Sequence, residues 1–396
     1  MDTPTRPRVA ARFGGLERSA TMVLHDVVQE LRAAGRSIVD LAKGEPDQPT
    51  PTVVTDAAIT ALRDGHTRYT VSRGIPELRA EIAKKLAADN AIHVDADDGV
   101  VVTPSGKHAL FVAMMAILDP GDEIIVPSPG WVSYRAMAQL VGARAVPAEL
   151  TDADGYRLTG DVLAGGLTER TKAVLVNTPN NPTGRVLDSG ELDVLAEFVT
   201  EHDLLVITDE IYETIRFGGG PHLSVAARPE CADRTLTVNG LSKSHAMTGW
   251  RLGYLAGPPD LMAGAVKVQE HTVSCATSFV QHAAVAALTG ADHDVALMVA
   301  EYARRRDLVV SALDGLGGIT CPAPDGTFYA FPDIRGAGHG ESAEFAEWLL
   351  REAGVAIVPG PAFGPGGEGH MRLSFAVPAT VLSDALERMT EALSSS

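Results

Sequence analysis

The chain has little cysteine, no block of basic residues and no long apolar run, and each shortage narrows what it can be. Its three cysteines are odd in number and widely spaced, which fits neither a disulfide framework nor a zinc cluster. We therefore expect no metal, and buried thiols except at Cys275. A formal net charge of −18 without clustered Lys or Arg argues against nucleic acid or an anionic membrane surface as the main partner.

The longest apolar run, Ala109 to Leu118, is too short to span a bilayer, so we expect no membrane segment. The opening residues carry charges but no apolar core of the kind a signal peptide needs. These two observations together predict a cytoplasmic protein. We find no internal repeat and no low-complexity linker in the sequence.

The composition is typical of a globular protein, with 45% apolar and 21% charged residues in a chain of 396 residues. That length exceeds what one core usually fills, so two domains are expected. From residue 100, short β-branched runs alternate with helical stretches, which predicts an α/β fold with one large, mostly parallel sheet of about seven strands. The expected strands are Val100–Thr103, Glu123–Val126, Arg144–Pro147, Lys172–Asn177, Leu204–Thr208, Thr235–Val238 and Leu252–Ala256.

A second, smaller α+β domain is expected from the two ends of the chain. An amphipathic helix at 21–34, ended by Gly35, precedes a Pro- and Gly-rich stretch at 43–51 that is typical of a crossing between domains. A long helical region is expected from Pro259 to about Leu313, followed by mixed helix and strand. We predict residues 1–48 and 286–396 in the small domain and 49–285 in the large one.

One lysine stands out in the stretch Asn239-Gly-Leu-Ser-Lys-Ser-His-Ala-Met-Thr-Gly-Trp-Arg251. Because Asn239-Gly240 is a turn signal after the strand at 235–238, Lys243 is expected on a loop at a strand's C-terminal end, where open α/β sheets bind ligands. An isolated lysine is usually a surface charge. Here, however, the flanking serine hydroxyls and the returning Arg251 suit a phosphorylated aldehyde, with a Schiff base at one end and a phosphate clamp at the other.

Two further motifs lie at expected strand ends. Ser105-Gly106-Lys107 falls at a helix N-terminus, which binds anions through free N–H groups, although a plain helix cap is the commoner meaning. Asp209 follows an apolar strand, where a buried acid is costly unless it has a partner, and Tyr212 comes three residues later.

These motifs, together with Asn181-Pro-Thr-Gly184 and Gly369-His-Met-Arg-Leu-Ser-Phe375, resemble in order those of class I aminotransferases, the aspartate aminotransferase family. The resemblance runs from about residue 14 to 376. It implies a fold-type-I enzyme that uses pyridoxal 5′-phosphate, forms a homodimer with shared active sites, and acts on an amino acid and a 2-oxo acid. It also implies cis peptides before Pro129 and Pro182.

The resemblance assigns roles to individual residues. Lys243 would hold the cofactor and move a proton, Asp209 would pair with the ring nitrogen, and Tyr212 would tune the site as a third catalytic group. Arg372 would bind the substrate α-carboxylate through two parallel hydrogen bonds. Other implied cofactor contacts are Ser105, Gly106, Lys107, Trp131, Asn181, Ser242, Arg251 and Tyr69, the last from the partner subunit; implied substrate contacts are Gly44, Asn181, Trp131, Lys107, Ser19 and Thr21.

The substrate expectation rests on Lys107 and on Ser19-Ala-Thr21, which resemble residues that contact acidic side chains in a bacterial subgroup of aspartate aminotransferases. Aspartate or glutamate is therefore the first choice. Gly130, where an aromatic is frequent, and Cys275-Ala276, in place of Asn-Pro, leave open a wider pocket for arginine, aromatic or unusual donors.

Elimination, decarboxylation or oxidase chemistry on the same fold is a second alternative. A non-catalytic regulator would need a DNA-binding module, and the lysine motif opposes a periplasmic binding protein.

Overall fold

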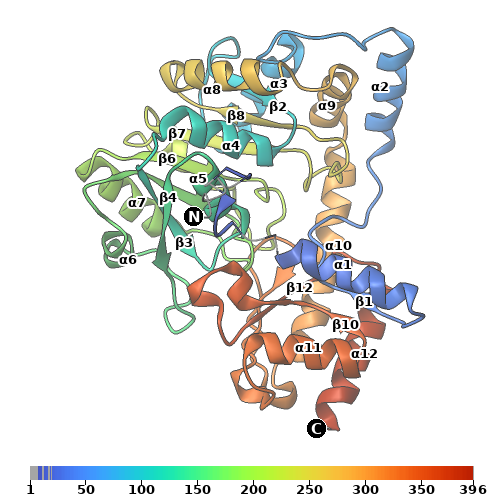
Figure 1. Cartoon of the computed structure of the whole chain (residues 1–396). Coiled ribbons are helices and arrows are strands. Elements are labelled where there is room, and N and C mark those ends of the chain that lie inside the picture. The colour runs from blue at the N-terminus through green and yellow to red at the C-terminus, as the bar shows by residue number, and fades with distance from the viewer. Residues whose placement is uncertain (1–7, 11–12, 17, 19, 396) are drawn as a thin grey trace, which may run out of the picture.

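The computed structural model describes residues 8–10, 13–16, 18 and 20–395 (Figure 1). Its centre is a seven-stranded sheet in the order β2-β8-β7-β6-β5-β3-β4. All neighbours are parallel except β8, which is antiparallel to both β2 and β7. The predicted sheet is thus confirmed, with ends that differ by one or two residues: β2 Val100–Thr103, β3 Glu123–Ser128, β4 Arg144–Glu149, β5 Thr171–Asn177, β6 Leu205–Asp209, β7 Thr235–Gly240 and β8 Gly253–Ala256.

The prediction of a turn at Asn239-Gly240 is wrong. Both residues belong to β7 and pair with Tyr254 and Gly253 of β8. Glycine is required here for close approach of the two strands. A Cβ on Gly240 would lie 2.9 Å from the Cα of Gly253. The loop that carries Lys243 therefore begins only after Gly240.

Helices cover both faces of the sheet, so the large part of the molecule has three layers. The helices α4, α5 and α8 pack on one face, and α6 and α7 share the other with α2, α3 and α9. The bounds of these helices are α2 Thr52–Arg63, α3 Pro76–Asn90, α4 Gly106–Ile117, α5 Ser133–Leu140, α6 Gly160–Gly165, α7 Ser189–Glu201, α8 Pro259–Thr272 and α9 Ser278–Gly290. Strands buried on both faces explain why their sequences are almost continuously apolar.

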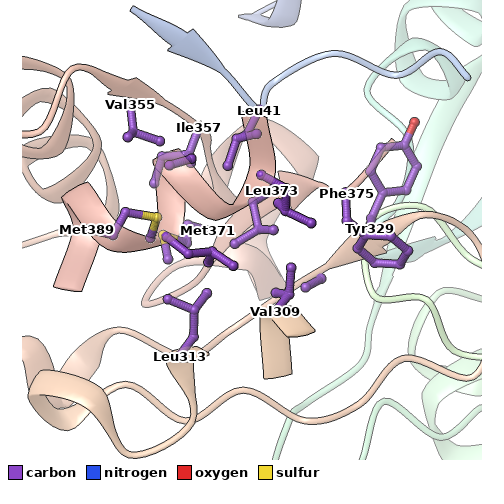
Figure 2. Close-up of a cluster of buried hydrophobic side chains, with 14 of the residues drawn as sticks. Leu41, Val309, Leu313, Tyr329, Val355, Ile357, Met371, Leu373, Phe375 and Met389 are labelled. Carbon is purple, nitrogen blue, oxygen red and sulfur yellow. The ribbon is translucent and has the colours of Figure 1, made fainter. Parts of the chain in front are cut away.

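Helix α1 and strand β1, from the first part of the chain, pack with the C-terminal elements below this sheet in Figure 1. Strand β1 (Val39–Asp40) pairs in parallel with β10 (Val355–Ala356), and β12 (Met371–Ser374) lies between β11 (Val358–Pro359) and β9 (Tyr329–Ala330). Figure 2 shows the apolar core that joins them. The surrounding helices are α1 Ala20–Ala33, α10 Asp292–Leu313, α11 Ser342–Glu352 and α12 Ala379–Ser394. The exact domain boundaries stay a prediction.

The region predicted as one long helical stretch is divided into α8, α9 and α10. Helices α9 and α10 meet at an angle of 75°. Among the described residues no single helix is long and apolar enough to cross a membrane, and this bent pair reaches that length and hydropathy only when both helices are counted together. Cys231 and Cys321 are buried and Cys275 is partly exposed, as expected.

Candidate active site

A cavity of about 490 Å³ opens at the carboxyl ends of the sheet strands. Its floor comes from the large sheet, and Arg372 on β12 and residues of α1 and β1 close it from the other side. Thirteen of the predicted site residues line it: Thr21, Gly44, Ser105, Gly106, Lys107, Trp131, Asn181, Asp209, Tyr212, Ser242, Lys243, Arg251 and Arg372.

Lys243 projects into this cavity from the loop after β7. Its ammonium donates a hydrogen bond to the carbonyl oxygen of Gly44, which lies in the irregular stretch after β1. Burial lowers the pKa of Lys243 to about 8, and Glu45 opposes that shift. With a pKa of about 8, roughly a tenth of this amine is unprotonated at pH 7, far more than for an ordinary lysine, and the unprotonated form is the one that attacks a carbonyl.

Asp209 ends β6 at the bottom of the cavity and is 4% exposed. Tyr134 on α5 donates to its Oδ2 at 2.8 Å, and the backbone N–H of Ile211 donates to Oδ1 at 3.3 Å. Burial raises the pKa of Asp209 to about 6 in spite of these donors. A cationic N–H placed against this carboxylate would relieve its desolvation.

An anion site lies at the start of α4. Ser105 caps the helix, with its Oγ accepting from the N–H of His108 at 3.1 Å. Lys107 and Arg251 both line the cavity at this place. Burial lowers the pKa of Lys107, and the positive charge of Arg251 lowers it further. A Cβ on Gly253 would lie 2.2 Å from the N–H nitrogen of Gly106, so the backbone here is packed against β8. Two cations beside free helix N–H groups favour a phosphate.

Arg251 reaches this place through an uncommon backbone conformation, with φ at +56°. Its Nη1 donates to the carbonyl oxygen of Thr248 at 2.7 Å, which closes a turn through Gly249. The predicted return of this arginine toward the lysine is thus observed.

Arg372 is 2% exposed and has no carboxylate partner among the described residues. Its Nη1 donates to Asn181 Oδ1 at 3.1 Å and its Nη2 to the Ala42 carbonyl oxygen at 2.7 Å, while Nε is buried without an acceptor. The guanidinium carbon lies 4.3 Å from the centre of the Tyr329 ring and 4.9 Å from that of the Phe363 ring. A buried cation without a counter-ion is costly, so this arginine is suited to binding an anion.

Aromatic residues complete the walls. The hydroxyls of Tyr212 and Tyr329 lie 3.0 Å apart, and burial raises the pKa of Tyr212 well above its usual value. Trp131 packs edge-on against Tyr134, and the Lys107 ammonium lies 4.8 Å from the centre of the Trp131 ring. Peptides before Pro129 and Pro182 are cis, as expected, and so is the one before Pro179, which was not predicted.

Of the two remaining predicted residues, Tyr69 was expected at the partner's site and not at this one. Tyr69 lies outside the lining of this cavity and is 88% exposed. Ser19 falls outside the described residues. Sequence reasoning in turn missed Tyr134 and Tyr329, which contact Asp209 and Tyr212, because only packing between distant elements brings them there.

The comparisons with known proteins agree over nearly the whole chain. The sequence pattern described as aminotransferase class I and II matches residues 36–389. An aspartate aminotransferase of Musicola paradisiaca is 44% identical over 385 residues, which are 97% of this chain and 96% of that protein. The structure of the Thermus thermophilus aspartate aminotransferase with maleate superposes with a TM-score of 0.92 at 39% identity, covering 98% and 100% of the two chains. An aromatic aminotransferase from Pyrococcus horikoshii OT3 gives a TM-score of 0.89 at 40% identity, covering 94% and 99%.

Proposed function

Because this chain belongs to the class I and II aminotransferases, we propose that it binds pyridoxal 5′-phosphate through Lys243 and moves the amino group of an acidic amino acid to a 2-oxo acid. The observation that carries the proposal is the cavity around a half-buried lysine of lowered pKa. It has one anion site at the start of α4 and a second at Arg372.

The residues present fit this cofactor. The anion site of Ser105, Gly106, Lys107 and Arg251 suits a phosphate, and the buried carboxylate of Asp209 suits a protonated ring nitrogen. When bound, pyridoxal phosphate supplies an aldehyde for the amino group and a ring that accepts the electron pair left at the substrate α-carbon.

The protein's own residues divide the remaining work. Arg372 binds the substrate α-carboxylate and fixes which bond at the α-carbon stands perpendicular to the ring. Once the substrate amino group has displaced it from the aldehyde carbon, Lys243 Nζ would take the proton from the α-carbon as a general base and deliver it as a general acid to that aldehyde carbon, for which a pKa of about 8 is well matched to neutral pH. Asp209 keeps a cationic N–H at the floor of the cavity, and Tyr134 holds that carboxylate in place.

An acidic donor is supported by the position of Lys107 on the cavity wall beside Trp131. The relative from Musicola paradisiaca is an aspartate aminotransferase, and maleate, bound by the Thermus protein, is a dicarboxylate. An aromatic donor is the second candidate. It is favoured by the similarity to the Pyrococcus horikoshii enzyme and by Gly130, which puts no side chain where an aromatic ring is frequent.

A homodimer is part of the proposal. Tyr69 is a large aromatic residue that is 88% exposed, and Val71 beside it is 59% exposed. Burial of both against a second copy would remove apolar surface from water and would bring the Tyr69 hydroxyl to the partner's phosphate site.

Reduction with borohydride followed by peptide mass analysis tests the cofactor assignment. We expect the pyridoxyl mass on the peptide that contains Lys243. Its appearance on Lys107 or Lys267 instead would refute the role given to Lys243.

A further inference from the structure

A buried polar cluster lies directly behind the residues that face the cofactor cavity. Its members are Lys85 and Asn90 of α3, Glu210 and Glu213 after β6, and His222 and Ser224 before the next helical turn. None of the six lines the cavity. Apart from Lys85, which is partly buried, all are at most 8% exposed.

Asn90 is the centre of this cluster. Its side-chain NH2 donates to Glu213 Oε2 at 2.6 Å and to Ser224 Oγ at 2.8 Å, and lies 3.3 Å from Glu210 Oε2, which accepts from Ser224 Oγ at 2.6 Å. Its carbonyl oxygen accepts from Lys85 Nζ at 2.6 Å, and the same ammonium donates to Glu213. One side chain at the end of α3 thus holds Glu213 directly and Glu210 through Ser224.

The two glutamates sit in one tight turn with the two site residues. The N–H of Glu213 donates to the Glu210 carbonyl oxygen at 2.9 Å. Residues three apart share a side of such a turn, so Asp209 and Tyr212 face the cavity while Glu210 and Glu213 face the cluster. Any shift of the glutamates therefore moves the carboxylate and the phenol on the other side.

The cluster also affects the charge at the site. Burial opposes ionisation of Glu210, but His222, Ser224 and Lys85 hold its pKa below the usual range. Its negative charge is one of the influences that raise the pKa of Asp209. Lys85 supplies the positive charge that two buried carboxylates require.

We propose that Asn90, Lys85 and Glu213 are positioning residues that fix the turn from Asp209 to Glu213, so that Asp209 meets the ring nitrogen of the cofactor. This inference rests on the proposed use of pyridoxal phosphate. It assigns a function to Glu210 and Glu213, which follow Asp209 and Tyr212 in the sequence but do not enter the cavity.

The test compares two ligands that differ only at the ring nitrogen. Cofactor-free protein is titrated with pyridoxal phosphate and with its 1-deaza analogue, in which a C–H replaces that nitrogen, and the absorbance gives the apparent Kd of each. A hydrogen bond to a charged group predicts about 10- to 100-fold tighter binding of pyridoxal phosphate by the unmodified protein. If Asp209 is mispositioned, this preference falls to within about 3-fold even where the phosphate still binds.

The variants are Glu213→Gln, which removes the charge but keeps the shape, and the double variant Lys85→Met with Glu213→Leu. The double variant replaces the ion pair by apolar groups of similar volume, a change that buried pairs often tolerate. Glu81→Gln is the matched control, because it breaks the exposed Glu81–Lys84 pair on the same helix and should keep the full preference.

Equal weakening of both ligands would show a general scaffold and overturn the proposal, as would an unchanged preference in either folded variant. If neither variant folds, the cluster is a folding element and the positioning role is withdrawn. Failure of the unmodified protein to bind pyridoxal phosphate would instead refute the proposed function itself.

Discussion

Arg372 and Asn181, which are 191 positions apart in the chain, meet in the cavity, where the guanidinium donates through Nη1 to the Asn181 side-chain oxygen at 3.1 Å. The second terminal nitrogen donates to the Ala42 carbonyl oxygen at 2.7 Å. Because two hydrogen bonds and two aromatic rings contact it, the guanidinium has little freedom to turn. It is therefore held ready for a planar anion before any substrate arrives.

Replacement of Arg372 by Lys should lower kcat/KM by about 100-fold, or ~3 kcal/mol, in single-turnover half-reactions. Lysine keeps the charge but cannot offer two parallel N–H groups to a carboxylate, nor present a planar cation to the neighbouring rings. Cofactor absorbance with a series of amino acids measures the effect.

Arg306→Lys is the control for this change, because Arg306 also lies over an aromatic ring, that of Phe217, but outside the cavity. It should leave kcat/KM within about twofold, as for most surface substitutions. Similar losses in both variants would mean that Arg372 stabilises the fold and does not bind the α-carboxylate.

The sheet and the lysine loop could be predicted because their signals are local. Apolar runs marked each strand to within two residues, and Ser105, Asp209 and Lys243 each lie at or within three residues of the carboxyl end of a strand. Parallel strands bring their carboxyl ends to one edge, so these three residues had to be neighbours.

Contacts between distant elements could not be read in the same way. Tyr134 and Tyr329 are ordinary core tyrosines by sequence, and only the packing of α5 and β9 puts their hydroxyls beside Asp209 and Tyr212. The prediction of a turn at Asn239-Gly240 was wrong because the sequence does not distinguish a glycine that allows two strands to approach closely from one that allows a turn.

The lowered pKa of Lys243 predicts a pH-dependent stability of the cofactor-free protein. Between about pH 8 and the pKa of 10.5 of an unfolded lysine, the unfolded chain holds a proton that the folded one has lost, so stability rises with pH. From pH 8 to 9.5 this group should add about 1.5 kcal/mol to the free energy of unfolding.

Denaturant unfolding of the protein and of Lys243→Met over this range isolates the contribution of Lys243. The methionine variant should be the more stable of the two at pH 7, and the difference should shrink as the pH rises. A difference that stays constant with pH would show that the lysine has an ordinary pKa.

The shared active site predicts complementation between two inactive variants. Tyr69→Ala spares Lys243, and Lys243→Ala spares Tyr69, so a mixed dimer contains one complete site. Random exchange of subunits at equal amounts should restore about a quarter of the sites. Activity of the mixture after mild unfolding and refolding measures this fraction, and a fully active monomer at low concentration would contradict it.

Lys107 is the residue through which the substrate class can be decided. Its ammonium lies beside the Trp131 ring and also near Arg251, so it can serve either a side-chain carboxylate or the phosphate. Two unit charges about 4 Å apart interact by up to ~4 kcal/mol at an effective dielectric constant of about 20. After the cost of desolvation we expect roughly 2–3 kcal/mol, or about 30- to 150-fold in kcat/KM.

Lys107→Ala should therefore lower kcat/KM for aspartate or glutamate by that factor and leave the alanine half-reaction nearly unchanged. Lys84→Ala, which removes an exposed lysine of α3, should change neither rate. A positive charge that binds the phosphate raises kcat/KM for every substrate alike, whereas one that binds a side-chain carboxylate raises it only for acidic substrates. Equal losses for acidic and neutral donors would therefore assign Lys107 to the phosphate, and the acidic-substrate proposal would give way to the aromatic one.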